Sequence, residues 1–351
     1  MLDRLRALYH PARFQGARRS RGYFEGWYFK CVAAVEGRDD PVTSSSALSP
    51  TGPPPPASEP AALAIIPGVS RAGDDGAAHS FVQVLRPGGR VRYFASPLCD
   101  FQYRADRFAI RVGPNVFDER HLSLDLPADE HGPAIRGEVR FGDWRPWPVT
   151  PAAPGIMGWY RYAPYMECYH GVLSLDHALD GELWLGDERL AFGGGRGYVE
   201  KDWGTSFPSS WVWAQSNHLP RAGISCMVSV ARIPWRGSSF TGHIAGLLLD
   251  GTLHRFATYT GSRLLEVATG DGGARVVVAD RRLRLEIELE GAVAGALKAP
   301  VLGAMQGRSE EALDGRMHVR LLTVGGNEVF AGSGVHAGVE IMNDRGELSA
   351  D

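Results

Sequence analysis

The residues best suited to chemistry are two carboxylates, Glu200 and Asp202, which a single lysine separates in the segment RGYVEKDW. Side chains alternate along an extended strand, so both carboxylates fall on one face, about 7 Å apart. If an aromatic cavity surrounds them, desolvation and like charge raise the pKa of one of the two. A carboxyl group that keeps its proton at neutral pH can act as a general acid. The spacing therefore predicts acid catalysis, provided that this face is buried.

The same alternation gathers polar and aromatic side chains on one face of four predicted strands. These faces hold Arg196, Tyr198, Glu200 and Asp202 in the first; Trp211, Trp213, Gln215 and Asn217 in the second; Tyr23, Glu25, Trp27 and Phe29 in the third; and Glu167 with Tyr169 in the fourth, opposite Cys168 and His170. Taken singly, charged strand residues are usually solvated, and tryptophans that alternate with small residues are usually core. Together the four faces favour a lined cavity that holds an amphipathic ligand.

Familiar cofactor and metal motifs are absent from the sequence. GGGRG at 193–197 precedes a strand-like segment, so it predicts a glycine-rich turn and not a dinucleotide-binding loop. The 11 histidines adopt no familiar ligand spacing, and the 4 cysteines form no C-x-x-C pair. Cys168 and His170 share a face, but a buried neutral cysteine is commoner than a cysteine nucleophile. We expect no cofactor and no metal site.

The elements that position these residues are predicted to be short strands. Glycine accounts for 44 of 351 residues and tryptophan for 9, a composition typical of strands joined by tight turns. Helical periodicity is nearly absent, and we expect short helical turns only at 2–9 and 307–313. Roughly twenty strands are too many for one small barrel. The sequence therefore predicts an all-β protein with two antiparallel β-barrels in tandem.

The predicted boundary between the barrels lies near residue 206. This gives an N-terminal barrel domain at 1–206 and a C-terminal barrel domain at 207–351. Residues 37–62 are rich in proline, serine and alanine, which predicts a disordered insert between two strands. The proline-rich segment 143–166 predicts a long functional loop that lies over an opening.

Charge and hydropathy exclude several classes of protein. The chain has 37 basic and 40 acidic residues, and a net charge of −3 argues against nucleic-acid binding by bulk charge. The first 27 residues lack the apolar run of a signal peptide, and no stretch approaches the roughly 18 apolar residues of a membrane span. We expect a cytoplasmic protein, peripheral to the membrane at most, that touches a membrane surface transiently to collect its substrate.

Four segments resemble the tocopherol cyclase family. They are GYFEGWYFK (22–30), MECYHGVLSLDH (166–177), GGRGYVEKDWGTSFPSSWVWAQSNH (194–218) and MQGRSEEALDGRMHVRL (305–321). The insert at 37–62 departs from the family's pattern. The resemblance implies an enzyme that closes the chromanol ring of vitamin E from a prenylated hydroquinone without a redox cofactor. It also implies a distant similarity to tandem lipocalin-like barrel proteins, in agreement with the two predicted barrels.

For this reaction we expect Asp202 to protonate the prenyl alkene, with Glu200 maintaining its raised pKa. The phenol oxygen then captures the tertiary cation, and His170 or His218 accepts the phenol proton. The remaining candidates bind substrate: Trp27, Trp203, Trp211 and Trp213 at the tail or the cation; Tyr169, Gln215 and Asn217 at the quinol head; and Glu25, Glu167 and Tyr198 as further contacts. Trp203 and His218 are out of phase with Asp202 and Asn217, so both assignments need a bulge or a strand end.

Two other functions stay open at this point. The same cavity can hold a quinol, a carotenoid or another lipid without reacting it, although a pure carrier gains nothing from desolvated carboxylates. A hydratase of isoprenoid alkenes would use the same acid but add the mass of one water to its substrate.

Overall fold

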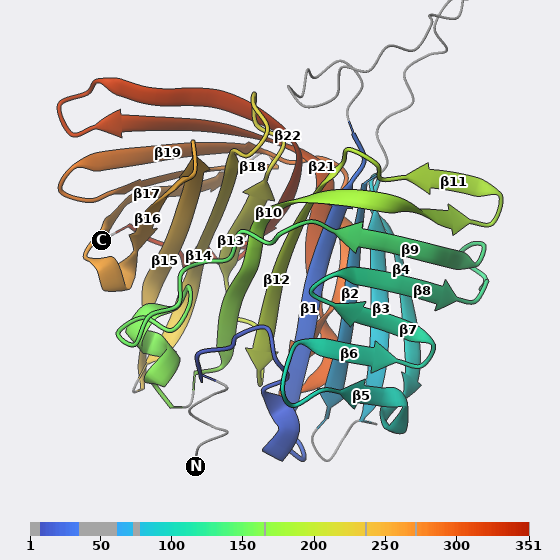
Figure 1. Ribbon diagram of the computed structural model, residues 1–351. Helices are drawn as coiled ribbons and strands as arrows, with labels where there is room; N and C mark the ends of the chain where they lie inside the picture. The colour runs from blue at the N-terminus through green and yellow to red at the C-terminus, as the bar shows by residue number, and fades with distance from the viewer. Residues whose placement is uncertain are drawn as a thin grey trace, which may run out of the picture.

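The computed structural model describes residues 8–34, 62–72, 78–164, 166–235, 237–270 and 272–350. Regular structure in these residues is almost entirely antiparallel strand, arranged in two large sheets (Figure 1). The helical elements are short 3-10 turns: η1 (Gly16–Arg18), η2 (Leu98–Asp100), η3 (Gly158–Tyr162) and η4 (Thr258–Thr260). The predicted all-β class is confirmed. Within the described ranges, no helical segment has the length and apolarity that a membrane crossing requires.

The first sheet places β12 at its centre, between β1 and β10. Its hydrogen-bonded order is β4-β3-β2-β1-β12-β10-β9-β8-β7-β6-β5, and β11 pairs with β10. The strands are β1 (Tyr23–Val32), β2 (Ala62–Arg71), β3 (His79–Arg86), β4 (Arg90–Pro97), β5 (Phe101–Tyr103), β6 (Ala109–Val112), β7 (Asn115–Asp118), β8 (His121–Leu126), β9 (Ile135–Phe141), β10 (Cys168–Leu185), β11 (Glu188–Ala191) and β12 (Arg196–Gly204). In Figure 1, β5–β9 run across β1–β4, so the sheet wraps around an apolar cluster that includes Trp27, Phe29 and Phe108.

A bend in the long strand β10 lets the first sheet wrap. Its early residues pair with β12, whereas its late residues pair with β9 and β11. Register shifts between Val172, Ser174 and His177 mark the bend, because an extra residue in one strand kinks it. Before the bend, His170 is the direct cross-strand partner of Asp202. The topology therefore joins two segments that the sequence separates by about thirty residues.

The second sheet contains the strands that follow residue 210, in the order β16-β15-β14-β13-β22-β21-β19-β18-β17, and β20 pairs with β21. Its strands are β13 (Trp211–Ser216), β14 (Ser225–Trp235), β15 (Ser238–Leu249), β16 (Thr252–Ala257), β17 (Arg263–Gly270), β18 (Gly273–Ala279), β19 (Leu283–Glu290), β20 (Gly295–Val301), β21 (Ala304–Thr323) and β22 (Glu328–Met342). A second apolar cluster fills its inner side and includes Val212, Ala214 and Phe256.

The two sheets face each other across a third apolar cluster. It contains Tyr28 and Tyr198 from the first sheet and Trp211 and Trp213 from the second. Among the described residues, the first ladder runs from β4 to β5 and the second from β16 to β17. The antiparallel pairing of the two predicted barrels is confirmed in two large sheets, whereas the closure of each sheet into a barrel stays a proposal.

The structure contradicts one local prediction and does not describe the region of another. The predicted helical turn at 307–313 is wrong, because these residues lie within strand β21, where Ser309, Glu311 and Leu313 alternate toward the buried side. The predicted insert at 37–62 lies outside the described residues except for Ala62, at which β2 begins.

Candidate active site

A cavity lies between the facing sides of the two sheets. Its volume is about 190 Å³. Its chemically active groups are His170, Glu200 and Asp202 on the first sheet and Glu311 and Glu340 on the second. Aromatic rings form much of the remaining lining: Phe24, Tyr28, Phe81, Tyr160, Phe207, Trp211, Trp213, Phe240 and Tyr259. An apolar cavity with a few convergent polar groups is the usual form of a site for a hydrophobic ligand.

His170 joins the two predicted carboxylates into one cluster. Its Nδ1 lies 2.9 Å from Oδ1 of Asp202, and its Nε2 lies 3.6 Å from Oε2 of Glu200. This Nε2 atom is buried and has no hydrogen-bond partner. Glu200 and Asp202 share a face of β12, as their spacing predicts, while His170 reaches them from β10. The structure thus brings three of the four predicted catalytic residues into one cluster, and His218 lies outside it.

The cluster holds protons at neutral pH. Burial raises the pKa of Glu200, and the charge of Asp202 raises it further; the nearby His170 opposes this shift, and the pKa lies at about 7. Burial lowers the pKa of His170, but Asp202 and Glu200 outweigh that effect and raise the pKa to about 9. At neutral pH, His170 is therefore a cation between an acidic pair, and Glu200 is protonated in about half of the molecules.

Two donors hold the Glu200 side chain against the cavity wall. The Tyr198 hydroxyl donates to Oε2 over 2.6 Å, and the Trp213 indole N–H donates to the same atom over 3.0 Å. Both donors are buried. Trp213 comes from the second sheet, so the position of the acid depends on both sheets.

Further polar contacts where the two sheets meet involve four residues that were not predicted from the sequence: Tyr28, Lys30, Glu311 and Glu340. The Trp211 indole N–H donates to Glu340 over 2.6 Å, and the Tyr28 hydroxyl donates to Oε1 of Glu311. Lys30 Nζ donates to the backbone oxygen and to Oε1 of Gln215, over 3.0 and 2.9 Å. Burial raises the pKa of Glu340 to about 7. Strand alternation would have placed Glu311 on the same face as Ser309 and Leu313. It was not applied there because a helical turn was expected at 307–313.

Comparison with known proteins gives the chain a family. A family model described as "Tocopherol cyclase-like" matches residues 142–342, more than half of the chain. The chain belongs to the tocopherol cyclase-like family. The matched residues include the His170–Glu200–Asp202 cluster and both cavity-lining acids of the second sheet, Glu311 and Glu340.

Curated relatives of this tocopherol cyclase-like chain come from plants. A probable chloroplastic tocopherol cyclase of Oryza sativa subsp. japonica is 24% identical over 225 residues, which cover 56% of this chain and 48% of the relative. A chloroplastic tocopherol cyclase of Zea mays is 27% identical over 153 residues, which cover 42% and 32%. The chain thus spans about half or less of the length of the curated relatives that it matches. The fold resembles a crystal structure of CghA with Sch210972, with a TM-score of 0.53, 13% identity and coverage of 91% and 88%.

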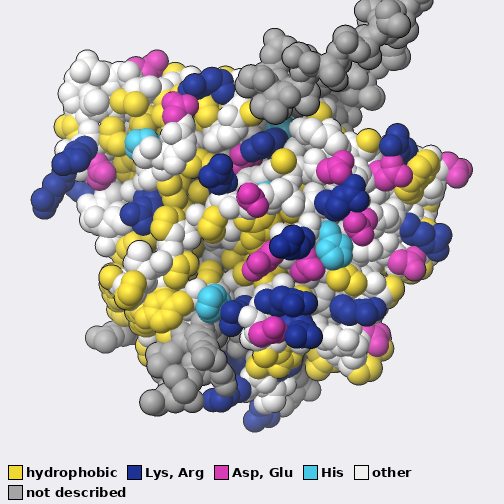
Figure 2. Space-filling model, viewed as in Figure 1, with side chains coloured by type: hydrophobic (Ala, Val, Ile, Leu, Met, Phe, Trp, Pro, Cys, Tyr) yellow, Lys and Arg dark blue, Asp and Glu magenta, His cyan; other side chains and the backbone are white. Residues whose placement is uncertain are grey.

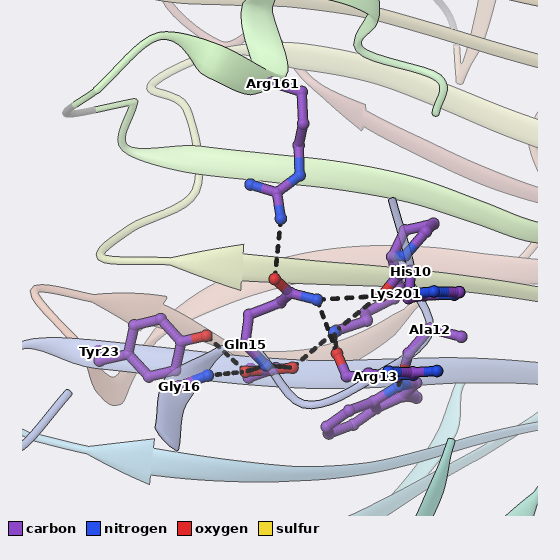
Figure 3. Close-up of polar contacts among 11 residues, drawn as sticks. His10, Ala12, Arg13, Gln15, Gly16, Tyr23, Arg161 and Lys201 are labelled. Atoms are coloured by element: carbon purple, nitrogen blue, oxygen red, sulfur yellow. Dashed lines mark hydrogen bonds and ion pairs between the residues drawn. The ribbon is translucent and has the colours of Figure 1, made fainter. Parts of the chain in front are cut away.

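Glu25 and Trp27 of the tocopherol cyclase-like chain do not line the cavity. They lie on the opposite face of β1, within the first sheet, where they hold the segment 10–16. Figure 3 shows part of this polar network, with Gln15, Gly16 and Lys201 labelled. Glu25 accepts the backbone N–H groups of Gln15 and Gly16 and forms an ion pair of 2.5 Å with Lys201. The Trp27 indole N–H donates to the backbone oxygen of Ala12. These contacts are structural, although the predicted shared face of β1 is present.

Five more substrate-binding candidates, and the catalytic candidate His218, are also not among the residues that line the cavity. Trp203 and Tyr169 stack on each other, with ring centroids 5.7 Å apart, on the face away from Asp202. Glu167 is exposed. The last three are buried beside the cavity and bonded to protein groups: Gln215 to Lys30, Asn217 to Asp176 and the Gly197 oxygen, and His218 to Asn217. Of the predicted substrate-binding residues, Tyr198 donates to Glu200, and Trp211 and Trp213 line the cavity.

The cluster also offers three metal-ligand atoms within 4.8 Å of one another, from His170, Glu200 and Asp202. A metal binds a deprotonated imidazole nitrogen, so it would have to displace the proton that Asp202 and Glu200 favour on His170 by raising its pKa to about 9. We therefore expect a chelator such as EDTA to leave the activity of the purified protein unchanged at pH 7. Loss of activity in EDTA, with recovery on adding one divalent metal, would instead identify the cluster as a metal site.

Proposed function

We propose that this protein closes an oxygen-containing ring on a prenylated hydroquinone, as a tocopherol cyclase does. The observation that carries the proposal is the His170–Glu200–Asp202 cluster in the wall of an aromatic cavity. Protonation of an isolated alkene needs an acid that stays protonated away from bulk water, and the raised pKa of Glu200 meets this need. Membership of the tocopherol cyclase-like family supports the same chemistry.

The proton steps balance within the cluster. Glu200 transfers its proton to the alkene and leaves a tertiary cation, which the phenol oxygen captures by forming the new C–O bond. His170 then returns a proton from Nε2 to Glu200, and the freed nitrogen accepts the phenol proton. Asp202 holds the imidazole in place through Nδ1. The product is an isomer of the substrate, so no cofactor is consumed.

This assignment gives the acid role to Glu200, although the sequence analysis assigns it to Asp202. Asp202 is the direct ion-pair partner of His170 through Nδ1. Glu200 has the raised pKa and lies against the rings of the cavity. Trp211 and Trp213 supply aromatic faces that can stabilise a nearby cation.

The cavity rim offers a path for a hydrophobic tail. Trp159 and Tyr162 of η3 are 48% and 43% exposed, and Tyr160 between them lines the cavity. Hydrophobic side chains gather on this part of the surface, at the lower left of Figure 2. The proposal therefore retains an isoprenoid substrate that the protein collects at a surface. It also retains the two predicted lipocalin-like barrel domains, at 1–206 and 207–351.

The proposal is tested by incubating the purified protein with a prenylated hydroquinone under anaerobic conditions. We expect a product of unchanged mass, with a new chromatographic retention and with the hydroquinone oxidation wave lost. A product heavier by one water would identify a hydratase, and recovery of unchanged substrate would leave only a carrier.

The rate of ring closure should fall as the pH rises through about 7. Glu200 must be protonated to donate, and its pKa of about 7 means that its protonated fraction falls about tenfold per pH unit above that value. His170, with a pKa of about 9, keeps its charge over the same range. The measurement is kcat/KM between pH 5 and 9, and a rate that rises across pH 7 would rule out Glu200 as the donor.

A further inference from the structure

Glu311 lines the cavity and has one carboxyl oxygen without a hydrogen-bond partner. The residue is completely buried, and its Oε1 accepts the hydroxyl of Tyr28. Its other oxygen, Oε2, has no hydrogen-bond partner although it is buried and the residue lines the cavity. A buried carboxyl oxygen without a partner is costly, since it has lost its water and gained nothing in exchange. A ligand that pairs with this oxygen recovers that cost.

The surroundings of Glu311 fix its position. Glu340 is its direct cross-strand partner on β22, and Gly338 lies beside the carboxyl group. A Cβ atom at position 338 would lie 3.4 Å from Oε1 of Glu311 and 2.9 Å from the ring of Trp213. A side chain there would therefore crowd both groups. The absence of a side chain at Gly338 thus leaves room for both the Glu311 carboxyl group and the Trp213 ring.

Glu311 is linked to the reaction cluster through two rings. Trp213 donates to Glu200 over 3.0 Å, and its ring meets the Tyr28 ring edge-on, with centroids 5.5 Å apart. Tyr28 in turn donates to Glu311. The reacting acid on the first sheet and the unpaired oxygen on the second are thus linked through the contact between the Trp213 and Tyr28 rings.

We propose that Glu311 is a specificity-determining residue that binds a second hydroxyl of the substrate ring, the one remote from the oxygen that reacts. A phenolic hydroxyl both donates and accepts, so it pairs with Glu311 whether the carboxyl group is ionised or protonated. The cavity then selects a hydroquinone over a monophenol with the same prenyl tail. This inference rests on the proposed function for its ligand, but it concerns binding and not the chemical step.

The test compares two probes: a prenylated hydroquinone, and the monophenol that lacks the hydroxyl para to the reacting oxygen. Quenching of tryptophan fluorescence gives the Kd of each. In the wild-type protein we expect the hydroquinone to bind roughly tenfold more tightly or better, because the monophenol leaves Oε2 unpaired. Glu311→Met should reduce this ratio to about one, mainly by weakening the hydroquinone, and Glu311→Gln should restore much of it.

The matched control is Glu310→Met, which changes an exposed neighbour on the same strand and should retain the wild-type ratio. Equal binding of both probes with ring closure intact overturns this inference and leaves the proposed function standing. A retained preference for the hydroquinone without ring closure supports this inference and overturns the proposed function. If neither probe binds, both are overturned. If Glu311→Met fails to fold, the wild-type ratio decides the question by itself.

Discussion

Replacing Glu200 with glutamine should slow ring closure by roughly 10²–10⁴-fold, the usual contribution of a positioned general acid. Glutamine keeps an oxygen that can accept from Tyr198 and Trp213, so the side chain stays in place without a proton to give. Ligand affinity should therefore change by no more than about threefold, because binding does not use that proton. The measurements are the steady-state rate by chromatography and the Kd by tryptophan fluorescence.

The control for this prediction is Glu167→Gln. Glu167 is exposed and is not among the residues that line the cavity, so its variant should have the wild-type rate. Asp202→Asn separates the two possible donors. It should slow the reaction through the loss of the His170 partner, but the rate should still fall with rising pH, since Glu200 is still the donor. The fall should begin at a lower pH than in the wild type, because the charge of Asp202 no longer raises the pKa of Glu200. A fully active Glu200→Gln beside an inactive Asp202→Asn would return the acid role to Asp202.

Replacing Lys201 with methionine should lower the free energy of unfolding by roughly 3–5 kcal/mol, the usual cost of removing one partner of a buried ion pair. Lys201 and Glu25 are both completely buried, and Lys201 Nζ also donates to the backbone oxygens of Pro11 and Arg13. Burial lowers the pKa of Lys201 to about 8, so the side chain is still charged at pH 7. Urea denaturation at pH 7 measures the change through the midpoint at constant m-value.

An exposed ion pair is the comparison for Lys201. Asp125 and Arg136 are bonded over 2.8 Å with both side chains largely exposed, and Asp125→Asn should leave stability unchanged because water screens the pair. The folded fraction of Lys201→Met should close the ring at close to the wild-type rate, because Lys201 and Glu25 lie on the faces away from the cavity. If stability is unchanged while activity is lost, then Glu25 belongs to the substrate site, as the sequence analysis expects.

Much of the site was predictable because strand alternation is a local property. Tyr198, Glu200 and Asp202 share one face of β12, and Trp211 and Trp213 share one face of β13, as the spacing indicates. Each of these relations depends only on the extended backbone of a single segment. His170 lies on the predicted face of β10 for the same reason.

Strand alternation could not show whether a given face lines the cavity or packs in the core of its own sheet. Glu25 and Trp27 share a face as predicted, but that face points into the first sheet, while Tyr28 and Lys30 on the other face turn toward the second. Both sides of β1 are buried, so hydropathy does not distinguish them. Glu311 and Glu340 were missed because they reach the cavity only through pairing between β21 and β22 and through contact between the two sheets.

By itself, the sequence determined the all-β class, the family likeness and the side chains that share a face on each strand, because these depend on composition, motif and local geometry. The tertiary structure alone decided which faces meet. Bringing β10 beside β12, and the second sheet against the first, placed His170 between two carboxylates and enclosed Glu200 away from water. The pKa of an acid depends on that enclosure and on those neighbours, so the assignment of the proton donor had to wait for the fold.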